Sequence, residues 1–287
     1  MTPEAWRRDR QDRVESALAE VFAEAWPPRF REACQYPLRT GGKRLRPLLC
    51  LAAAEAVGGV AGGGTPRPSE ENPALIAAVA LELLHTYSLV HDDLPCMDDD
   101  AMRRGRPTVH VVYGEGTAVL VGDALLTEAF ATLGRLPPGL VAPMVRELAA
   151  AGGASGMIAG QALDIGLDGA VVDRGALERL HRAKTGALLR ASVRMGGIAA
   201  GADSDTLAAL GTFGDAVGLA FQIRDDVLDA DQDAREGGPP SFVRLLGRDG
   251  AQALARAQAD AAVAAVRHLP APGPLCALAA MAVERDA

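Results

Sequence analysis

The stretch PALIAAVALELLHTYSLVHDDLPCMDDD, residues 73–100, decides the fold of this chain. Its first part predicts a helix that is apolar on nearly every side, and such a helix is buried inside a protein. The apolar positions are Leu75, Val79, Leu81, Leu84, Leu89 and Val90. Proline disfavours helix in the residue before it, so Leu94-Pro95 ends the predicted helix. The sequence therefore places carboxylates at the end of a core helix.

The rest of the chain also favours helix. Alanine, leucine and arginine dominate, and 49% apolar residues in a chain of 287 are enough for a large core. Glycine and proline clusters separate the helical patterns, but none is long enough to be a domain linker. We expect a single all-α domain over 1–287 with about ten or more helices, without strand alternation. The predicted helices cover 4–25, 43–58, 73–94, 116–135, 139–152, 174–200, 204–230, 249–268 and 273–285.

Two clusters of aspartate carry the chemical information. The first holds Asp92, Asp93, Asp98, Asp99 and Asp100, and the second holds Asp225, Asp226, Asp229, Asp231 and Asp233. Two carboxylates ~4 Å apart repel each other by about 4 kcal/mol at an effective dielectric of ~20. Such clusters therefore indicate divalent cations. Oxygen ligands favour Mg²⁺, and Mg²⁺ held by few carboxylates usually also binds phosphate.

The second cluster fits one face of a helix. Gln222, Asp225, Asp226 and Asp229 follow the spacing i, i+3, i+4, i+7. Carboxylates near the C-terminus of a helix oppose its dipole. Stability alone does not favour them there, so we interpret this face as functional.

Several cationic segments accompany the aspartates. Arg103 and Arg104 follow the first cluster and are suited to clamp phosphate. Lys43 and Arg46 stand in the segment 41–47, where two glycines would let the backbone approach a ligand closely. Lys43 and Lys184 are the two lysines among 29 basic residues, and both lie in motif-like segments. A compact, flexible ammonium at these positions indicates a role that arginine does not fill.

Two further positions are weaker candidates. Gly160-Gln161-Ala162-Leu163-Asp164 places a glutamine and an acid about one turn apart in an apolar helix. His85 lies seven residues before Asp92 on the same helical face. A lone histidine on an apolar face is usually a core residue, and the proximity of Asp92 is what makes this one a candidate.

Composition argues against other classes of function. The net charge is −8 and no basic run occurs, so nucleic acid is not an expected partner. The four cysteines are far apart and predict reduced thiols. The charged N-terminus does not resemble a signal peptide, and we expect no stretch apolar enough to span a membrane. A cytoplasmic protein is the expectation.

The chain resembles the bacterial short-chain trans-prenyl diphosphate synthases, the farnesyl and geranylgeranyl diphosphate synthase family. The resemblance runs from about residue 36 to 246. It rests on Gly-Gly-Lys-Arg-Leu-Arg-Pro at 41–47, Asp-Asp-x-x-x-x-Asp at 92–98, Arg103-Arg104-Gly105, Gly160-Gln161-x-x-Asp164, Lys184-Thr185-Gly186 and Phe221-Gln222-x-x-Asp225-Asp226-x-x-Asp229. It implies a bundle of mostly antiparallel helices around a central cavity, usually in a homodimer.

The resemblance also implies roles for individual residues. The implied Mg²⁺ ligands are Asp92, Asp98 and Asp225, supported by Asp164 and Asp229, with about three ions when substrate is bound. The allylic diphosphate would be held by Arg103, Lys184, Thr185 and Gln222. Isopentenyl diphosphate would be held by Lys43, Arg46, His85 and Arg104. The residues expected to act most directly in catalysis are Asp92, Asp98, Arg103, Lys184 and Asp225.

Product length in this family depends on the residue five positions before the first aspartate. Here it is Tyr87, about 7.5 Å along the helix axis from Asp92 at a rise of ~1.5 Å per residue. The resemblance favours a farnesyl-type product. An ideal helical wheel places Ser88 nearer to the Asp92 meridian than Tyr87, so Ser88 is included among the substrate-facing candidates.

One segment departs from the family pattern. Residues 230–242 form a loop about ten residues shorter than usual that contains no lysine. We expect weaker binding of the allylic diphosphate or slower closure in consequence.

Other functions remain open on the sequence. Geranylgeranyl diphosphate synthesis is one alternative. A catalytically weakened subunit that acts through a partner synthase is another, and the shortened loop favours it. A class I terpene cyclase has less need of Lys43, Arg46 and Arg104. A helical scaffold would leave the cationic segments unexplained.

Overall fold

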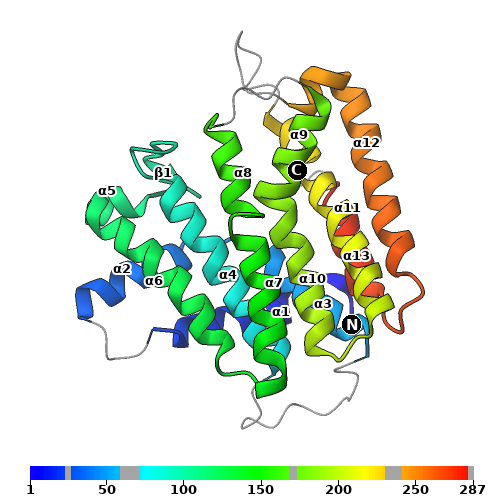
Figure 1. Ribbon diagram of the computed structural model, residues 1–287, viewed down its shortest axis with the longest axis horizontal. Helices are drawn as coiled ribbons and strands as arrows, with labels where there is room; N and C mark the ends of the chain where they lie inside the picture. Colours follow the sequence, from blue (N-terminus) through cyan, green and yellow to red (C-terminus); the bar gives the residue numbers. More distant parts are fainter. Residues whose placement is uncertain (23–26, 59–71, 168–172, 230–240, 284–287) are drawn as a thin grey trace. The chain divides into compact units, whose positions relative to one another are not determined.

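The computed structural model describes residues 1–22, 27–58, 72–167, 173–229 and 241–283, with only the backbone of Asp229. The protein is all-α, as predicted, and its described part contains helices α1 to α13 (Figure 1). The residues group into two compact units, described separately below. Unit 1 comprises Met1–Leu51 and Thr65–Val145, and unit 2 comprises Ala52–Gly64 and Arg146–Ala287.

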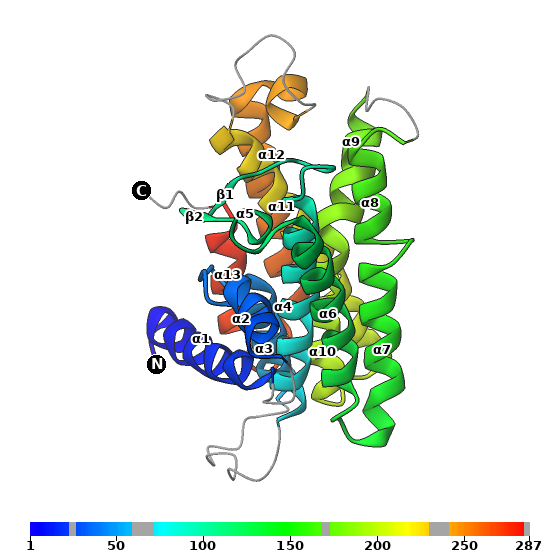
Figure 2. The same cartoon turned by 90° about the vertical axis from the view of Figure 1, so that its left-hand side faces the viewer.

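Unit 1 is built around α4. Its elements are α1 (Pro3–Glu20), α2 (Pro28–Leu38), most of α3 (Leu45–Ala56), α4 (Pro73–Asp92), strands β1 (Met102–Arg103) and β2 (Arg106–Pro107), α5 (Val109–Tyr113), α6 (Glu115–Leu133) and the first part of α7 (Pro138–Gly152). The hairpin and α5 return the chain so that α6 runs beside α4, as Figures 1 and 2 both show.

The limits of α4 follow from its sequence. The side chain of Asn72 accepts a hydrogen bond from the N–H of Ala74 at 2.9 Å, and Pro73 opens the helix. The helix ends at Asp92, with Asp93 as its C-cap, because Pro95 disfavours helix at Leu94. Most of its residues from Ala74 onward are buried, which confirms the prediction of a core helix.

The expectation that no stretch is apolar enough to span a membrane was wrong by length and composition. Among the described residues, three helical stretches meet that criterion: Pro73–Asp92, Glu115–Leu133 and Ser204–Leu228. Within the protein, 72% of the most apolar window of Pro73–Asp92 is buried, against 44% and 56% for the other two. Burial in the core of unit 1 accounts for the apolar character of α4.

Arg44 ties three parts of unit 1 together. It is 3% exposed and lies in the left-handed region with φ 47°. Its guanidinium donates to Glu15 on α1 at 2.7 Å and to Glu82 on α4 at 2.6 Å. It also donates to the carbonyl of Leu38, the last residue of α2. Arg44 is therefore a structural residue inside the 41–47 motif.

Unit 2 contains the longest helices. Its elements are the remainder of α3 and α7, α8 (Met157–Asp164), α9 (Arg174–His181), the π-helical turn η1 (Arg182–Gly186), α10 (Ala187–Ala199), α11 (Ser204–Asp229), α12 (Phe242–Val266) and α13 (Gly273–Met281). Helix α11 packs between α10 and α12, and Figure 1 shows α12 alongside α11. The core where α9, α11 and α12 meet includes Leu177, Ile223 and Phe242.

Most predicted helices are present, with informative differences. Helix α2 was not predicted. Pro28 occupies its first turn, where proline is tolerated. The short α5 and the two-residue strands were also missed. The predicted helix 249–268 begins earlier, at Phe242, and Gly247 breaks its helical geometry with φ 73°.

We expect Arg44→Met to lower the free energy of unfolding by about 3–5 kcal/mol, because Glu82 would remain buried without its cation. Glu82 is 2% exposed, so water cannot replace the lost partner. Urea denaturation of purified protein measures this. The matched control is Lys43→Met at the exposed neighbouring position, expected to change stability by no more than about 0.5 kcal/mol. Equal effects of the two substitutions would contradict the structural role of Arg44.

Candidate active site

The two aspartate motifs belong to different units. Unit 1 holds the first motif with Lys43, Arg46, His85, Tyr87, Ser88, Arg103 and Arg104. Unit 2 holds Asp164, Lys184, Thr185, Gln222, Asp225 and Asp229. Whether the two motifs face one another stays a prediction.

The first motif divides its aspartates between different environments. Asp92 is half-buried as the last residue of α4, and its carbonyl accepts the N–H of Asp98 at 2.9 Å. This hydrogen bond closes the turn that brings the backbone of the two predicted metal ligands together. Asp98 is exposed. Asp93, between them in the turn, is 4% exposed and faces the protein interior.

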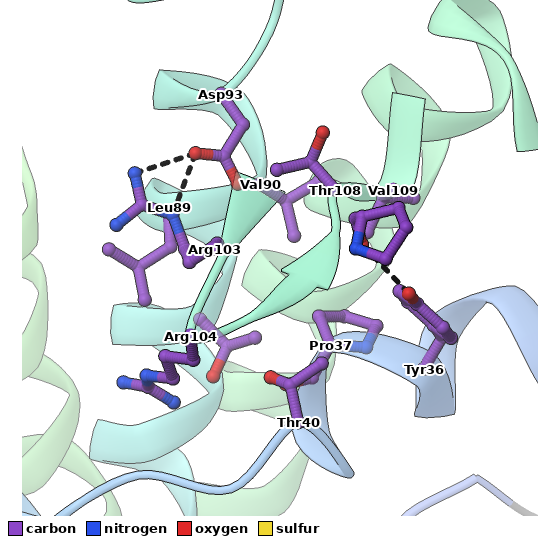
Figure 3. A pocket seen from close by; sticks show the side chains of 12 residues that line it. Tyr36, Pro37, Thr40, Leu89, Val90, Asp93, Arg103, Arg104, Thr108 and Val109 are labelled. Atoms are coloured by element: carbon purple, nitrogen blue, oxygen red, sulfur yellow. Dashed lines mark hydrogen bonds and ion pairs between the residues drawn. The ribbon is translucent and has the colours of Figure 1, made fainter. Parts of the chain in front are cut away.

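The carboxylate of Asp93 binds the guanidinium of Arg103 and is not exposed to a ligand. The carboxylate accepts from Nε of Arg103 at 2.7 Å and lies 2.6 Å from its Nη2, and Figure 3 shows both contacts. Arg103 also lies 3.3 Å from Asp100. Burial raises the pKa of Asp93, and the Arg103 cation opposes that rise. Arg103, predicted to clamp phosphate, is thus held in position by an aspartate of the motif.

The β1–β2 hairpin presents the two arginines differently. Its turn residues Arg104 and Gly105 both have positive φ, 52° and 75°. Such φ values at both central residues are typical of a two-residue hairpin turn. In Figure 3, the side chain of Arg103 lies toward Asp93, whereas that of Arg104 lies away from it.

Arg104 reaches the glycine turn of the 41–47 motif. Its Nη1 donates to the carbonyl of Gly41. A Cβ atom on Gly42 would stand 2.5 Å from the same nitrogen, so another residue there would displace the guanidinium from this position. The sequence suggested that these glycines admit a ligand. The structure shows that Gly42 admits the side chain of Arg104.

His85 lies in a strongly positive environment. Burial lowers its pKa well below the ordinary value, and the positive charges of Arg46, Arg104, Arg44 and Arg103 lower it further. The imidazole is therefore neutral at pH 7. Cations that gather around a neutral hydrogen-bonding group suit an anion such as diphosphate. This convergence brings together three of the four residues predicted to hold isopentenyl diphosphate, and the fourth, Lys43, is exposed nearby in sequence.

A small pocket lies beside these groups. It is lined by Tyr36, Pro37, Thr40, Thr86, Leu89, Val90, Asp93, Arg103, Arg104, Pro107, Thr108 and Val109 (Figure 3). Its apolar wall comes largely from α2 and α4, and both arginines line it. The cations of unit 1 therefore border a surface that combines apolar and charged groups.

Tyr87 and Ser88 have different surroundings. Tyr87 is 5% exposed, and its ring is edge-on to His91 with centroids 5.7 Å apart. The His91 ring in turn occupies the space left by Gly122 on α6. Ser88 is half-buried and its hydroxyl donates to the carbonyl of His85 at 2.8 Å. Tyr87 is thus a bulky buried side chain five residues before the first aspartate, and its role in product length stays a prediction.

In unit 2, Lys184 pairs with Asp164. The ammonium lies 2.5 Å from Oδ2 of Asp164, across the contact between η1 and α8. Both residues were predicted to be functional, and the structure brings them together. Thr185, next in the π turn, is half-buried.

The second motif uses one aspartate for internal structure. Asp226 accepts the N–H of Phe242 at 2.6 Å and lies 4.0 Å from Nε2 of His181. The rings of His181 and Phe242 stack at 5.6 Å. Gln222 and Asp225, one turn apart on α11, are half-buried. The loop departure predicted at 230–242 lies largely outside the described residues, which resume at Ser241.

Two residues of this region were not predicted as site residues. Both amide atoms of Gln161 are buried without a hydrogen-bond partner among the described residues, and so is Nε2 of His181. Buried polar groups are normally satisfied, so these atoms point to a ligand or a water position. Gln161 belongs to the motif Gly160-Gln161-x-x-Asp164, and that motif could have identified it as a site residue. No motif in the sequence marked His181 as a site residue.

The donor set fits Mg²⁺ without forming a closed metal cage. Within the described residues, no group of three or more metal-ligating side chains lies close enough to hold an ion. Mg²⁺ commonly takes one or two carboxylates, with water and substrate phosphate completing its coordination. Asp92 and Asp98, exposed or half-exposed at the end of a buried helix, offer oxygen ligands of this kind.

Comparison with known proteins agrees with this chemistry. The polyprenyl synthetase family model matches residues 27–242. Farnesyl diphosphate synthase of Geobacillus stearothermophilus is 41% identical over 246 residues, which cover 84% of this chain and 80% of that protein. A chloroplastic heterodimeric geranylgeranyl pyrophosphate synthase large subunit of Arabidopsis thaliana is 44% identical over 242 residues, covering 81% of this chain but 62% of the plant protein.

Solved structures share the fold. An FPP/GFPP synthase of Zymomonas mobilis superposes with a TM-score of 0.87 at 34% identity, covering 98% of this chain and 99% of that one. A geranyltransferase of Helicobacter pylori gives 0.84 at 35% identity, covering 99% and 100%. An isoprenoid synthase-type all-α fold with these motifs defines a trans-prenyltransferase. The chain belongs to the polyprenyl synthetase family.

We expect acid to destabilise the fold through His181. Burial lowers its pKa from 6.5 to about 4, so the unfolded chain binds the proton more readily. Stability associated with this residue is complete above pH 6.5 and falls by about 3 kcal/mol as the pH drops to 4. Urea denaturation across this range, compared with His181→Phe, measures the effect. Phenylalanine keeps the stacking on Phe242, so the variant should lose less stability in acid. Parallel pH curves for the two proteins would contradict this.

Proposed function

We propose that this protein condenses isopentenyl diphosphate with dimethylallyl or geranyl diphosphate to form farnesyl diphosphate. The observation that carries the proposal is that Arg103 and Arg104 line one pocket with residues of the helix that ends in Asp92. Their charges, together with that of Arg46, also lower the pKa of His85 on the same helix. A second anion site beside an aspartate motif is needed to condense two diphosphates. A cyclase, with one diphosphate substrate, does not need it.

The proposed metal ligands are Asp92, Asp98 and Asp225, with Asp164 and Asp229 in support. About three Mg²⁺ ions with substrate present would match this set, since Mg²⁺ is usually shared between few carboxylates and phosphate. The bound metal would supply positive charge to the departing diphosphate. The current partner of Asp164 is Lys184, so binding would require these two side chains to separate or to share the diphosphate.

The remaining residues bind and orient the two substrates. Arg103, Lys184, Thr185 and Gln222 would hold the allylic diphosphate and stabilise the negative charge that develops as its C–O bond breaks. Lys43, Arg46, His85 and Arg104 would hold isopentenyl diphosphate. Neutral His85 can donate a hydrogen bond to an oxygen without a proton transfer.

The chemistry requires no side-chain base. The double bond of isopentenyl diphosphate attacks the allylic carbon, the new carbon–carbon bond forms, and the leaving diphosphate accepts the proton that is lost. The protein must keep water from the allylic cation, and the apolar residues below the first motif, including Tyr87, suit that task. The predicted catalytic aspartates are assigned to metal binding and Lys184 to the diphosphate, so none of them is required as a base.

The proposals on domain organisation, oligomeric state and location rest on the family match, on exposed apolar residues and on the cysteines. The family model spans both units, which supports one prenyl synthase domain over 1–287. The exposed apolar residues Val111, Val112, Val119 and Leu120 on α5 and α6 support a homodimer. Free thiols at Cys34, Cys50, Cys96 and Cys276 support a cytoplasmic location.

Geranylgeranyl diphosphate synthesis is the second candidate function, favoured by relatives that are named for that activity.

We expect the purified protein, with Mg²⁺, isopentenyl diphosphate and geranyl diphosphate, to form a C15 product identified by mass spectrometry. Dimethylallyl diphosphate as primer should give the same final product, and omission of Mg²⁺ should abolish it. Asp92→Asn and Asp225→Asn are the inactive controls. No product with any allylic primer would refute the proposed function, and a C20 product would favour the second candidate.

We expect Tyr87→Ala to lengthen the main product from C15 toward C20. Removal of the buried ring opens space one turn below the first aspartate, where the growing chain would lie. Chromatography of dephosphorylated products measures the change. Ser88→Ala is the matched control, since it removes a single oxygen and should leave product length unchanged. An identical product profile for wild type and Tyr87→Ala would reject Tyr87 as the length determinant.

A further inference from the structure

The helical segment 174–199 contains one π turn, and it includes two of the four residues predicted to bind the allylic diphosphate, Lys184 and Thr185. Helices α9 and α10 continue into one another through η1, where the N–H of Ala187 donates to the carbonyl of Arg182, five residues earlier. Lys184 and Thr185 lie inside this turn. A π turn holds one residue more than an α turn, and such turns are rare and frequent at functional sites.

Glycines on two neighbouring helices press against this turn. A Cβ atom on Gly160 of α8 would stand 2.2 Å from the backbone nitrogen of Lys184 and 2.4 Å from its Cα. A Cβ atom on Gly218 of α11 would stand 2.9 Å from Cα of Gly186. The backbone of the π turn is thus in close contact with a glycine on each of the two helices, and neither glycine has a positive φ that would otherwise explain it.

The same face of α8 also holds the lysine side chain. Asp164 follows Gly160 by four residues and is therefore on the same side of the helix. Its carboxylate binds the ammonium of Lys184 at 2.5 Å. Gly160 fixes where the backbone of Lys184 lies, and Asp164 fixes where its ammonium points.

We propose that Gly160 and Gly218 are positioning residues, which hold the π turn so that Lys184 and Thr185 are directed to the allylic diphosphate. If the turn relaxed to α-helical geometry, it would hold one residue fewer. The side chains before it would then be rotated about the helix axis, relative to α10, by the angle of one residue, about 100°. Contact of the backbone with α8 and α11 opposes this rearrangement. The inference rests on the proposed function, because it assumes the role of Lys184 in diphosphate binding.

The protein offers a matched control for general packing. Gly214 lies one turn before Gly218 on α11, and a Cβ atom there would stand 2.5 Å from Cα of Arg190. Gly214→Ala therefore disturbs the contact between α10 and α11 outside the π turn. Gly273→Ala, at the start of α13 with no atom within 4 Å of the added Cβ, controls for the glycine-to-alanine change itself.

The test is steady-state kinetics with geranyl diphosphate and isopentenyl diphosphate, together with thermal unfolding of each variant. Gly218→Ala and Gly160→Ala should lower kcat/KM for geranyl diphosphate about 100-fold, the scale of a ~1 Å misplacement. The KM for isopentenyl diphosphate should stay within about twofold, because its proposed ligands lie in unit 1. Gly214→Ala should lower the Tm while keeping the kinetics of both substrates near wild type. Gly218→Ala is the milder change and carries the test if Gly160→Ala does not fold.

Three results would overturn the inference, and they separate it from the proposed function. Wild-type allylic kinetics in folded Gly218→Ala, while Lys184→Ala is inactive, would reject the positioning role alone. An equal loss of allylic kcat/KM in Gly214→Ala would assign the effect to general packing. Full activity of Lys184→Ala, or no product from the wild type, would remove the proposed role of Lys184 and the inference with it.

Discussion

Charge at the edge of an apolar core must be matched by opposite charge, and this constraint shapes the functional regions of the protein. Where such a charge is buried, as in Arg44 and Glu82, an unmatched ion would be strongly destabilising. Arg44 is matched by Glu15 and Glu82, Arg103 by Asp93, and Lys184 by Asp164. Arg194 makes the same kind of pair with Glu147, with contacts of 2.6 to 3.0 Å.

Some of these ion pairs connect helices, and others hold residues that are predicted to bind substrate. The sequence motifs do not distinguish the two kinds. Arg44 and Arg194 are anchored to carboxylates and to backbone carbonyls, and they connect helices. Arg103 and Lys184 are partly exposed, and each binds an aspartate of a neighbouring motif. An anionic substrate could compete for the second kind but not for the first. Exposure therefore separates Arg44, whose side chain is fully buried, from Arg103 and Lys184, which are accessible to a diphosphate.

Glycine has a comparable double role in the motifs. The segment 41–47 and the Gly160-Gln161 motif both suggested a close approach of backbone to ligand. In the structure, Gly42 leaves room for the guanidinium of Arg104, and Gly160 leaves room for the backbone of Lys184. In both cases the glycine brings a cationic residue to its place. Each glycine would therefore affect substrate binding indirectly, through the position of Arg104 or Lys184.

The sequence by itself determined the all-α class, the core helix ending at Asp92, most helix positions and the family, because these depend on local periodicity and on short motifs. The helix α2, the π turn and the hairpin escaped it. The π turn packs against glycines on other helices, and the two-residue strands are too short to show an alternating pattern. Tertiary structure alone decided that Asp93 holds Arg103, that Asp226 caps the start of α12, and that Arg44 is internal. Residues of one motif have similar spacing and charge, but only the packing around each side chain sets its exposure and partner.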